Sequence, residues 1–447
     1  MVAPFRITLK SSISCFGFER KIEETITGLD NWFDSTRSAG GYGGPVVHWW
    51  QDSLAYTGPS LDWRYEGIIS GYLNLYQGTG DAHWLAKACR AGDDLVAGQL
   101  PSGNFRSSAF EINPLSGGTP HEAACDLALL RLARILKAEK DERWTCYAAT
   151  AECNLQQFVL GILWDDQREI FQNTAYDASF VPNKAATIVE ALLAWGEVTN
   201  DSTFLMIYVL PTLERIMKSQ VRDSHSSKDG AIYQAISGAG PNERFFPYYI
   251  ARCIPALVAG YTITDRNLYL ESARSAINFI LRYRLPDGSF PQVIYGNGKV
   301  NRYPQWIAAT GDILWAMELL NQYGAAIDIE PTLRWLLQGR QPTGSIRTAF
   351  GFGSMVSQRE PSPLPDFRDL IGVCGWNDKA FHYLTNHVIS TMTRKKGDQN
   401  RKFAMPCCCF GKAAIFCEND RQIQIRTGQT TFFCWQKGAS WAVISRS

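Results

Sequence analysis

An excess of charge of one sign and long apolar runs are both missing from this sequence. Its 447 residues contain 44 lysines and arginines against 43 aspartates and glutamates. Nucleic acids and anionic membranes are usually bound through a basic excess, so this balance gives no support for either as the main partner. No stretch reaches the roughly 18 apolar residues of a membrane span. Residues 1–21 lack the apolar core, roughly 7–15 residues long, that a signal peptide requires.

Several catalytic and metal-binding motifs are absent as well. The sequence contains neither GxSxG nor HExxH, and the glycine-rich "GGYGGP" (40–45) lacks the Lys-Ser/Thr of a phosphate-binding loop. The twelve cysteines are scattered, and "PCCCFG" (406–411) has no CxxC pair to hold zinc. We therefore expect no metal and no cofactor. Without an export signal, free thiols in the reducing cytoplasm are the natural expectation.

What the sequence does contain is a repeated helical unit. A proline followed by polar or aromatic residues leads into a small-residue, apolar segment in "FVPNKAATIVEALLAW" (180–195) and "FFPYYIARCIPALVAGY" (245–261). Such helix starts recur at intervals of roughly 60 residues, far longer than a tetratricopeptide or ankyrin unit. The six starts are Arg64, His121, Asn183, Tyr248, Gln305 and Asn377.

Each interval holds a second helix of different character. The first helix is apolar nearly all round, which indicates burial, and the second is more charged and amphipathic. Several second helices follow an aspartate that resembles an N-cap: Asp81, Asp141, Asp201 and Asp265. Inner and outer layers follow, and the sequence predicts a mainly α protein, an (α/α)6 toroid. We expect the segment 19–35 to supply the sixth outer helix and close the ring.

The C-terminal part differs from the repeat. "RQIQIRTG" and "QTTFFCWQK" contain β-type residues separated by turn signals. They predict a small antiparallel β meander from about 410 to 447, packed on the ring, after a charged linker. The predicted domains are a catalytic toroid of residues 1–395 and a β appendage of residues 400–447.

Long loops join each outer helix to the next inner helix. They are rich in glycine and aromatic residues, and loops longer than roughly 12–15 residues are usually functional or disordered. Their aromatic content argues against disorder. We expect all of them to emerge at the end of the ring where the inner helices begin, so that a cleft opens there.

Carboxyl groups at these helix starts are the candidate catalytic residues. Glycoside cleavage commonly uses two carboxyl groups with different pKa values across a cleft. Glu122 is the first choice, with Glu66 or Asp62 as its partner and His121 as a base or hydrogen-bonding group. Each could instead serve as a helix cap, a salt-bridge member or a satisfied polar residue. Asp126 and Asp312 could equally brace helices or act on substrate.

Aromatic and polar residues around the same helix starts are the candidate substrate-binding groups. Their rings could stack on sugars or simply plug the core of the ring. Tyr248, Tyr249 and Arg252 could also supply the base and charge neutraliser of a lyase or epimerase. The predicted binding residues are Trp49, Trp50, Trp63, Arg64, Tyr248, Tyr249, Arg252, Gln305, Trp306, Trp376 and Asn377.

The six hairpins with long loops on one face resemble the (α/α)6 toroid of carbohydrate-active enzymes, which include glycoside hydrolases, polysaccharide lyases and uronyl epimerases. The resemblance covers roughly residues 18–390 and is architectural. "RAGDDLVAGQLPSGNF" (90–105) is similar to the QW motif of squalene-cyclase-like barrels, with Asp94 and Phe105 in place of its aromatic and tryptophan. We interpret this turn as a structural staple.

The resemblance implies an enzyme that cleaves an oligosaccharide or glycoconjugate, most directly by hydrolysis with a carboxylate acid and base. The alternatives are a polysaccharide lyase or uronyl C5-epimerase, a terpene or polyprenoid cyclase-like enzyme with an apolar cavity, and a non-catalytic glycan-binding protein. The sequence does not specify the sugar, the linkage or the oligomeric state.

Overall fold

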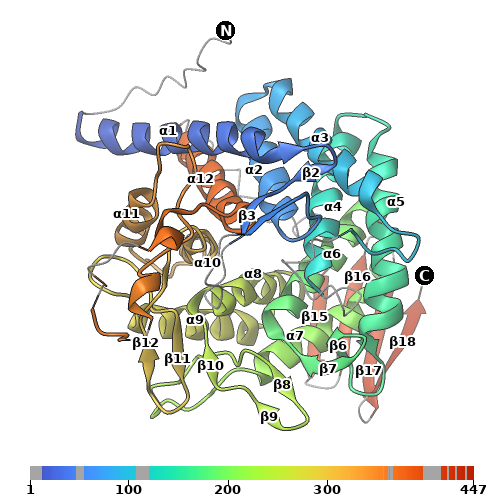
Figure 1. The fold of residues 1–447 in the computed structure, drawn as a ribbon. Helices are drawn as coiled ribbons and strands as arrows, with labels where there is room; N and C mark the ends of the chain where they lie inside the picture. Colours follow the sequence, from blue (N-terminus) through green and yellow to red (C-terminus); the bar gives the residue numbers. More distant parts are fainter. Residues whose placement is uncertain are drawn as a thin grey trace.

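The computed structural model describes residues 13–46, 55–106, 120–355, 357–360, 362, 366–395, 414–419, 422–427, 430–437 and 440–446. The cysteine motif at 407–409 lies outside these residues. Six helices form an inner ring in which each packs against the next and α12 packs against α2 (Figure 1). They are α2 (Arg64–Thr79), α4 (Ala123–Ala138), α6 (Pro182–Thr199), α8 (Pro247–Thr264), α10 (Thr310–Asn321) and α12 (Cys374–Lys395).

Glycine allows α12 to approach both of its neighbours in the ring. A Cβ atom on Gly67 of α2 would collide with the backbone carbonyl of Asp378, and one on Gly311 of α10 with that of Lys379. Only a residue without a side chain permits such close approach of two helix backbones. The ring is therefore closed tightly at α12, which brings Asp378 and Lys379 next to α2 and α10.

A second layer of helices surrounds the ring. It contains α3 (Ala82–Gly98), α5 (Trp144–Asn154), α7 (Leu210–Lys218), α9 (Asn267–Arg282) and α11 (Glu330–Gln338). The π-helical turns η2 (Leu155–Leu163) and η3 (Leu205–Val209) adjoin α5 and α7. Helix α1 (Ile13–Thr36) lies against α12 and α11. The toroid of inner and outer helices that the sequence predicts is thus the observed architecture.

Most of the aspartates predicted to start outer helices accept the expected bond. Asp81 accepts from the backbone nitrogen of His83 at 2.9 Å, Asp141 from Arg143 at 3.0 Å and Asp201 from Thr203 at 2.9 Å. Asp265 does not fit this pattern, because it ends α8 in the left-handed conformation with φ 56°. Its carboxylate resembled an N-cap only because α9 begins two residues later, at Asn267.

The QW-like turn at 90–105 is a staple between outer helices. The Gln99 amide donates to the carbonyl of Gly103 at 3.0 Å and to that of Thr150 on α5 at 2.8 Å. Gln220 repeats the arrangement two repeats later, donating to the carbonyls of Gly230 and Ser272, each at 3.0 Å. Each staple ties the end of one outer helix to the next.

Short antiparallel strands fill the connections between the helices. They form pairs or small sheets in the order β1-β2, β3-β4, β5-β6-β7-β8-β9, β10-β11-β12 and β13-β14. Their bounds are β1 Arg37–Ser38, β2 Gly41–Tyr42, β3 Gly44–Val46, β4 Ala55–Thr57, β5 Trp164–Asp165, β6 Ile170–Thr174, β7 Asp177–Phe180, β8 Ile236–Ser237, β9 Gly240–Pro241, β10 Arg244–Phe245, β11 Val293–Tyr295, β12 Val300–Asn301, β13 Gln305–Trp306 and β14 Ala349–Phe350. Three 3-10 turns complete the set: η1 Pro120–Glu122, η4 Phe352–Ser354 and η5 Phe367–Leu370.

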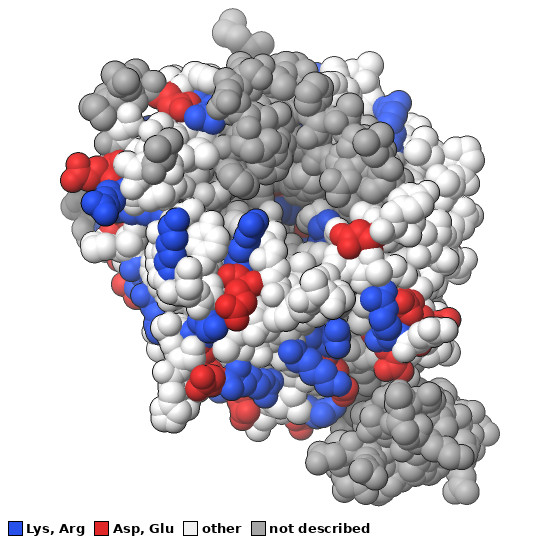
Figure 2. Space-filling model, turned by 60° about the horizontal axis from the view of Figure 1, so that its bottom comes forward, with Lys and Arg blue, Asp and Glu red and all other residues white. Residues whose placement is uncertain are grey.

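The last four strands form one antiparallel sheet in sequence order. They are β15 (Ala414–Asn419), β16 (Gln422–Thr427), β17 (Thr430–Lys437) and β18 (Ser440–Arg446). Within the part of the chain that the structure describes, no helix combines the length and apolar character needed to cross a bilayer. Figure 2 shows lysine and arginine interspersed with aspartate and glutamate over the face it displays, as expected from the balanced charge.

Candidate active site

Charged side chains from all six inner helices gather inside the ring. The sequence places each of them on a buried, otherwise apolar helix, where a charge is costly unless other charges or hydrogen bonds compensate it. We call this set the charged layer. Its members are Glu66 of α2, Arg131 of α4, Glu190 of α6, Arg252 of α8, Asp312 of α10, and Asp378 and Lys379 of α12.

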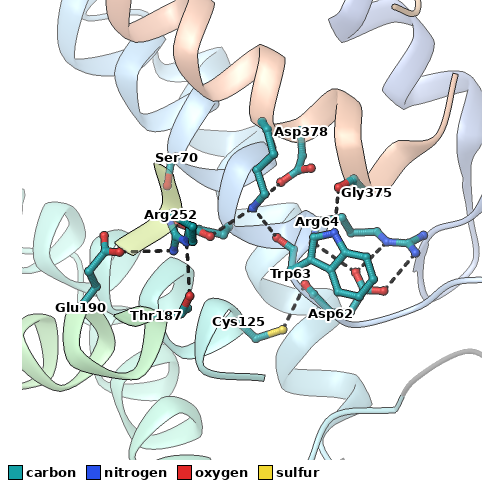
Figure 3. Close-up of polar contacts among 12 residues, drawn as sticks. Asp62, Trp63, Arg64, Ser70, Cys125, Thr187, Glu190, Arg252, Gly375 and Asp378 are labelled. Carbon is teal, nitrogen blue, oxygen red and sulfur yellow. Dashed lines mark hydrogen bonds and ion pairs between the residues drawn. The ribbon is translucent and has the colours of Figure 1, made fainter. Parts of the chain in front are cut away.

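Glu66 is the anion on which three cations of this layer converge. Its carboxylate lies 2.8 Å from Arg252, 3.2 Å from Lys379 and 3.6 Å from Arg131. Figure 3 shows the first of these cations, Arg252, between Glu190 and Thr187. Burial would by itself raise the pKa of Glu66, but the attraction of Arg252, Lys379 and Arg131 outweighs it and holds the pKa well below its usual range. Glu66 is therefore ionised at any physiological pH.

Glu190 shares two of these cations. One oxygen lies 3.4 Å from the same Arg252 nitrogen that binds Glu66, and the other lies 3.5 Å from Arg131. The two carboxylates are consequently no farther apart than the roughly 5–9.5 Å typical of glycosidase carboxyl pairs. Burial raises the pKa of Glu190 despite Arg252. The Arg252 guanidinium also donates to the Thr187 hydroxyl at 3.2 Å, which fixes its orientation.

Asp312 is the acid of the layer that remains available. Its side chain is half-buried, whereas Glu66, Glu190 and Asp378 are fully buried. Among the described residues it makes neither a hydrogen bond nor an ion pair, although Lys379 and Arg252 are close enough to act on it electrostatically. Burial raises the pKa of Asp312 against these cations. A carboxyl group of this kind can carry a proton and present it to a bound molecule.

Asp378 contributes to the layer in a different way. It is fully buried and lies 3.1 Å from the ammonium of Lys379, its neighbour in sequence. Burial raises the pKa of Asp378 even so. The Lys379 ammonium also reaches the backbone carbonyl of Trp63 at 3.4 Å, so Lys379 links the charged layer to the residues above it.

Aromatic rings cover the charged layer at the end where the inner helices begin. We call them the aromatic layer: Trp63, His121, Tyr248, Trp306 and Trp376. Trp376 lies 6.5 Å from Trp63, 5.2 Å from Trp306 and 5.8 Å from Tyr248, measured between ring centroids. The Trp63 ring lies 5.3 Å from that of His121, and its nitrogen donates to the Gly375 carbonyl at 2.7 Å. Tyr249 adjoins this layer, 4.6 Å from Tyr248.

Two imidazoles in this region are held neutral. Burial lowers the pKa of His121 well below its usual range, and Lys184, Lys379 and Arg252 lower it further. Burial and Arg131 lower the pKa of His382 on α12 to about 3, and its ring lies 5.2 Å from that of Trp315. Both rings are therefore neutral at neutral pH, and a neutral imidazole carries one nitrogen that is an acceptor.

Glu122 does not join either layer, which argues against its predicted catalytic role. Its carboxylate accepts bonds from the amide of Asn104 at 3.1 Å, the backbone nitrogen of Phe105 at 3.1 Å and the amide of Asn154 on α5 at 3.1 Å. It thus braces the loop at 103–105 against the outer layer. Burial raises the pKa of Glu122 to about 7 despite these bonds. Asp126, one turn farther along α4, is fully buried as well.

Asp62 and Arg64 are engaged with each other and not with the ring interior. The Arg64 guanidinium binds the two Asp62 oxygens at 2.7 and 3.0 Å and donates to the Tyr42 carbonyl at 3.3 Å. A buried bidentate pair of this kind fixes the entry of α2 and leaves neither group for substrate. We therefore interpret Asp62 and Arg64 as structural.

Gln305 and Asn377 brace loops in the same manner. The Gln305 amide donates to the Ser289 hydroxyl at 3.0 Å from strand β13, because the inner helix α10 starts only at Thr310. Asn377 exchanges two bonds with the backbone of Ile346, at 2.7 and 2.8 Å. Both side chains are buried. Trp49 and Trp50, the remaining predicted binding residues, lie outside the described part of the chain.

The structure therefore unites Glu66, His121, Trp63, Tyr248, Tyr249, Arg252, Trp306 and Trp376 from the sequence prediction. It adds residues that the sequence did not single out, of which Lys379, Glu190 and Arg131 are the main examples. One signal could have found them: each is a charged residue within an apolar helix, at a helical spacing from a residue already chosen. No group of three or more metal-binding side chains occurs among the described residues.

Comparisons with known proteins give fold information alone. No protein-family model and no curated protein matches this sequence. Among solved structures, an unsaturated glucuronyl hydrolase specific for heparin is 14% identical with a TM-score of 0.61, covering 85% of this chain and 97% of its own. A D-mannose isomerase is 14% identical with a TM-score of 0.58, covering 86% and 100%.

A third solved structure extends the range of activities on this fold. The GH76A α-1,6-mannanase of Salegentibacter sp. HEL1_6 is 12% identical with a TM-score of 0.53, covering 83% of this chain and 99% of its own. All three share the (α/α)6 toroid and act on carbohydrates, but they differ in reaction. The fold comparison therefore supports the predicted architecture and leaves the reaction to be argued from the site.

Proposed function

We propose that this protein is a carbohydrate-active enzyme that hydrolyses a glycosidic bond of an oligosaccharide or glycoconjugate. The charged layer supplies carboxyl, guanidinium and ammonium groups of the kind that hydrogen-bond sugars, and the aromatic layer offers faces for stacking on sugar rings. Enzymes of the same fold that act on heparin, mannan and mannose support the assignment of a carbohydrate substrate.

The observation that carries the proposal is a pair of carboxyl groups with opposed pKa shifts. Arg252 and Lys379 act on both Glu66 and Asp312, yet the pKa of Glu66 is lowered and that of Asp312 is raised. In glycosidases, opposed pKa shifts of two neighbouring carboxyl groups keep one protonated, as the acid, and the other ionised. We assign Asp312 as the proton donor and Glu66 as the ionised carboxylate.

In the proposed step, Asp312 donates its proton to the glycosidic oxygen as the bond from that oxygen to the anomeric carbon breaks. Water attacks the same carbon and forms the new C–O bond, and its proton passes to the neutral imidazole of His121. Solvent then returns the proton to Asp312. Glu66 does not receive this proton, because its carboxylate is engaged in ion pairs with Arg252, Lys379 and Arg131; it holds these cations in place.

An acidic sugar is the substrate class that fits this site best. Arg131, Arg252 and Lys379 surround Glu66, the one carboxylate of the layer whose pKa is lowered. The pKa values of Glu190, Asp312 and Asp378 are raised, which favours their uncharged forms. A bound carboxylate would compensate these cations. It would also offset their effect on His121 and so raise the pKa of its imidazole, making it a better base.

Epimerisation or β-elimination is the second candidate, favoured by the two neutral imidazoles. His121 and His382 could remove and return a proton next to a carboxyl or carbonyl group, and a mannose isomerase shares the fold. A terpene cyclase is disfavoured, since its cavity should be mostly apolar with a single acid. A non-catalytic glycan-binding protein is the remaining candidate.

We also propose that residues 1–395 form the catalytic domain, with α1 completing the outer layer, and that residues 400–447 form a β appendage to it. A cytoplasmic location is consistent with the described cysteines Cys89, Cys125, Cys146, Cys153 and Cys253, none of which forms a disulfide.

The experiment that tests the function is a panel of neutral and acidic oligosaccharides with product analysis by mass spectrometry. Hydrolysis adds one water across the cleaved bond, elimination gives an unsaturated product without added water, and epimerisation leaves the mass unchanged. The proposal requires the first outcome with an acidic substrate. Binding without any product would identify a glycan-binding protein instead.

A further inference from the structure

A lysine at the edge of the aromatic layer is not explained by the reaction above. Lys184 lies in the first turn of α6, directly after the β6–β7 hairpin, and its side chain is half-buried. Its ammonium donates to the side-chain oxygen of Asn173 on β6 at 2.7 Å. Lysine has three N–H donors, and this is its one hydrogen bond among the described residues.

The hairpin holds this ammonium in a fixed place. The Asn173 amide donates to Asp177 on β7 at 2.6 Å, and Asp177 also accepts from the backbone nitrogen of Ser179 at 3.0 Å. The Asp177 carboxylate is thus engaged with Asn173 and Ser179, and Lys184 forms no ion pair within the described residues. The neutral Asn173 amide orients the ammonium, and Asp177 acts on its charge through space without forming an ion pair with it.

The position of Lys184 connects it to the aromatic layer. Turn η1, which carries His121, packs against both α6 and β6. Among the cations that lower the pKa of the His121 imidazole, Lys184 has the largest effect, ahead of Lys379 and Arg252. His121 in turn adjoins Trp63 of the aromatic layer. Lys184 therefore lies beside the aromatic layer, at the end of the ring where the inner helices begin.

We propose that Lys184 is a specificity-determining residue that binds a second anionic group, a sulfate or carboxylate, on a sugar unit lying outside the charged layer. This inference rests on the function proposed above. Burial of the ammonium outweighs the through-space attraction of Asp177, and an anion from the substrate in direct contact with Lys184 relieves that remaining cost. In agreement, burial lowers the pKa of Lys184 to about 8.

The test compares two probes that differ in one anionic group: an unsaturated heparin disaccharide without sulfate and its counterpart with one sulfate. Binding is followed by quenching of tryptophan fluorescence, since three of the five rings of the aromatic layer are tryptophans. We expect Lys184→Gln to weaken binding of the sulfated probe about tenfold and of the unsulfated probe less than twofold, the loss expected for one charge-assisted contact. Lys184→Arg should restore most of the difference.

Lys137 provides a matched control at the opposite end of the ring. It lies in the last turn of α4, and its ammonium donates to the Val198 carbonyl at 2.7 Å. Lys137→Gln removes the same charge and should leave both affinities unchanged. If Lys184→Gln lowers the affinity for the two probes equally, or lowers neither, the proposed role of Lys184 is overturned and the proposed function is not. Failure of the unaltered protein to bind or cleave either probe would overturn the proposed function together with it.

Discussion

Glu66 and Arg252 form an ion pair of 2.8 Å although 186 residues separate them in the chain. The pair joins α2 to α8 through the interior of the ring. Both side chains are buried, so water cannot take the place of a missing partner. Breaking a buried pair by removing one partner is strongly destabilising, because the remaining charge stays buried. The charged layer is therefore both a part of the site and a part of the fold.

The first prediction concerns this dual role. Glu66→Gln should lower the free energy of unfolding by roughly 3–5 kcal/mol, since Arg252, Lys379 and Arg131 lose their shared anion. Urea denaturation followed by circular dichroism measures the change. Glu330→Gln, which removes an exposed pair with Arg334, is the control and should cost less than about 1 kcal/mol. Equal effects in the two variants would show that Glu66 is not held as described.

The second prediction concerns Glu122 and pH. Its folded-state pKa is raised to about 7 from 4.5 by burial, so the folded protein holds this proton more tightly than the unfolded chain. The stability from this group is full below the unfolded pKa and is lost as pH rises from about 4.5 through about 7, by about 3 kcal/mol at most. Urea denaturation across this range should show the slope.

Glu122→Gln should flatten that slope and leave turnover per folded molecule within about tenfold, because the side chain braces a loop outside the two layers. The expected cost in stability is about 1–3 kcal/mol for imperfectly matched hydrogen bonds. The exposed Glu142→Gln variant serves as the control and should keep the unaltered pH profile. A loss of turnover beyond about a hundredfold at full stability would restore Glu122 as a catalytic residue.

The third prediction concerns the aromatic layer. Trp376→Ala removes the ring that contacts Trp63, Trp306 and Tyr248, so affinity for the substrate should fall at least about tenfold, or about 1.4 kcal/mol. Isothermal titration calorimetry measures it. Trp164→Ala is the matched control, since that ring packs on Phe171 at 4.9 Å in a peripheral strand pair. If both variants bind equally well, the rings are core plugs only.

Much of the fold could be predicted from the periodicity of the sequence. The expected helix start at Arg64 coincides with that of α2, and Asn183 and Tyr248 fall one residue inside α6 and α8. The helix start expected at Gln305 was wrong, because the proline and aromatic residues around it resemble those at the other helix starts. Here Gln305 and Trp306 form the short strand β13, and α10 begins at Thr310. Polar residues before a helix indicate its approach but do not fix its first residue.

The site was harder to predict than the fold, and α4 shows why. One residue along a helix turns the side chain by about 100°. Glu122 at the start of α4 consequently faces the outer layer, whereas Arg131 of the same helix reaches Glu66 and Glu190 in the interior. A single sequence gives the polar residues but not the direction of the ring axis, so it could not show that Glu122 is directed at the outer layer.

Single-turnover kinetics of Asp312→Asn on the acidic substrate found in the panel test the central claim most directly. Asp312 has no described hydrogen-bond or ion-pair partner to lose, so we predict unchanged stability and a fall of at least about a hundredfold in the chemical rate, the size of a general-acid contribution. Asp265→Asn, at the exposed left-handed end of α8, should keep the full rate. A rate within about threefold of the unaltered protein in Asp312→Asn would contradict the assignment of the charged layer as the reacting site.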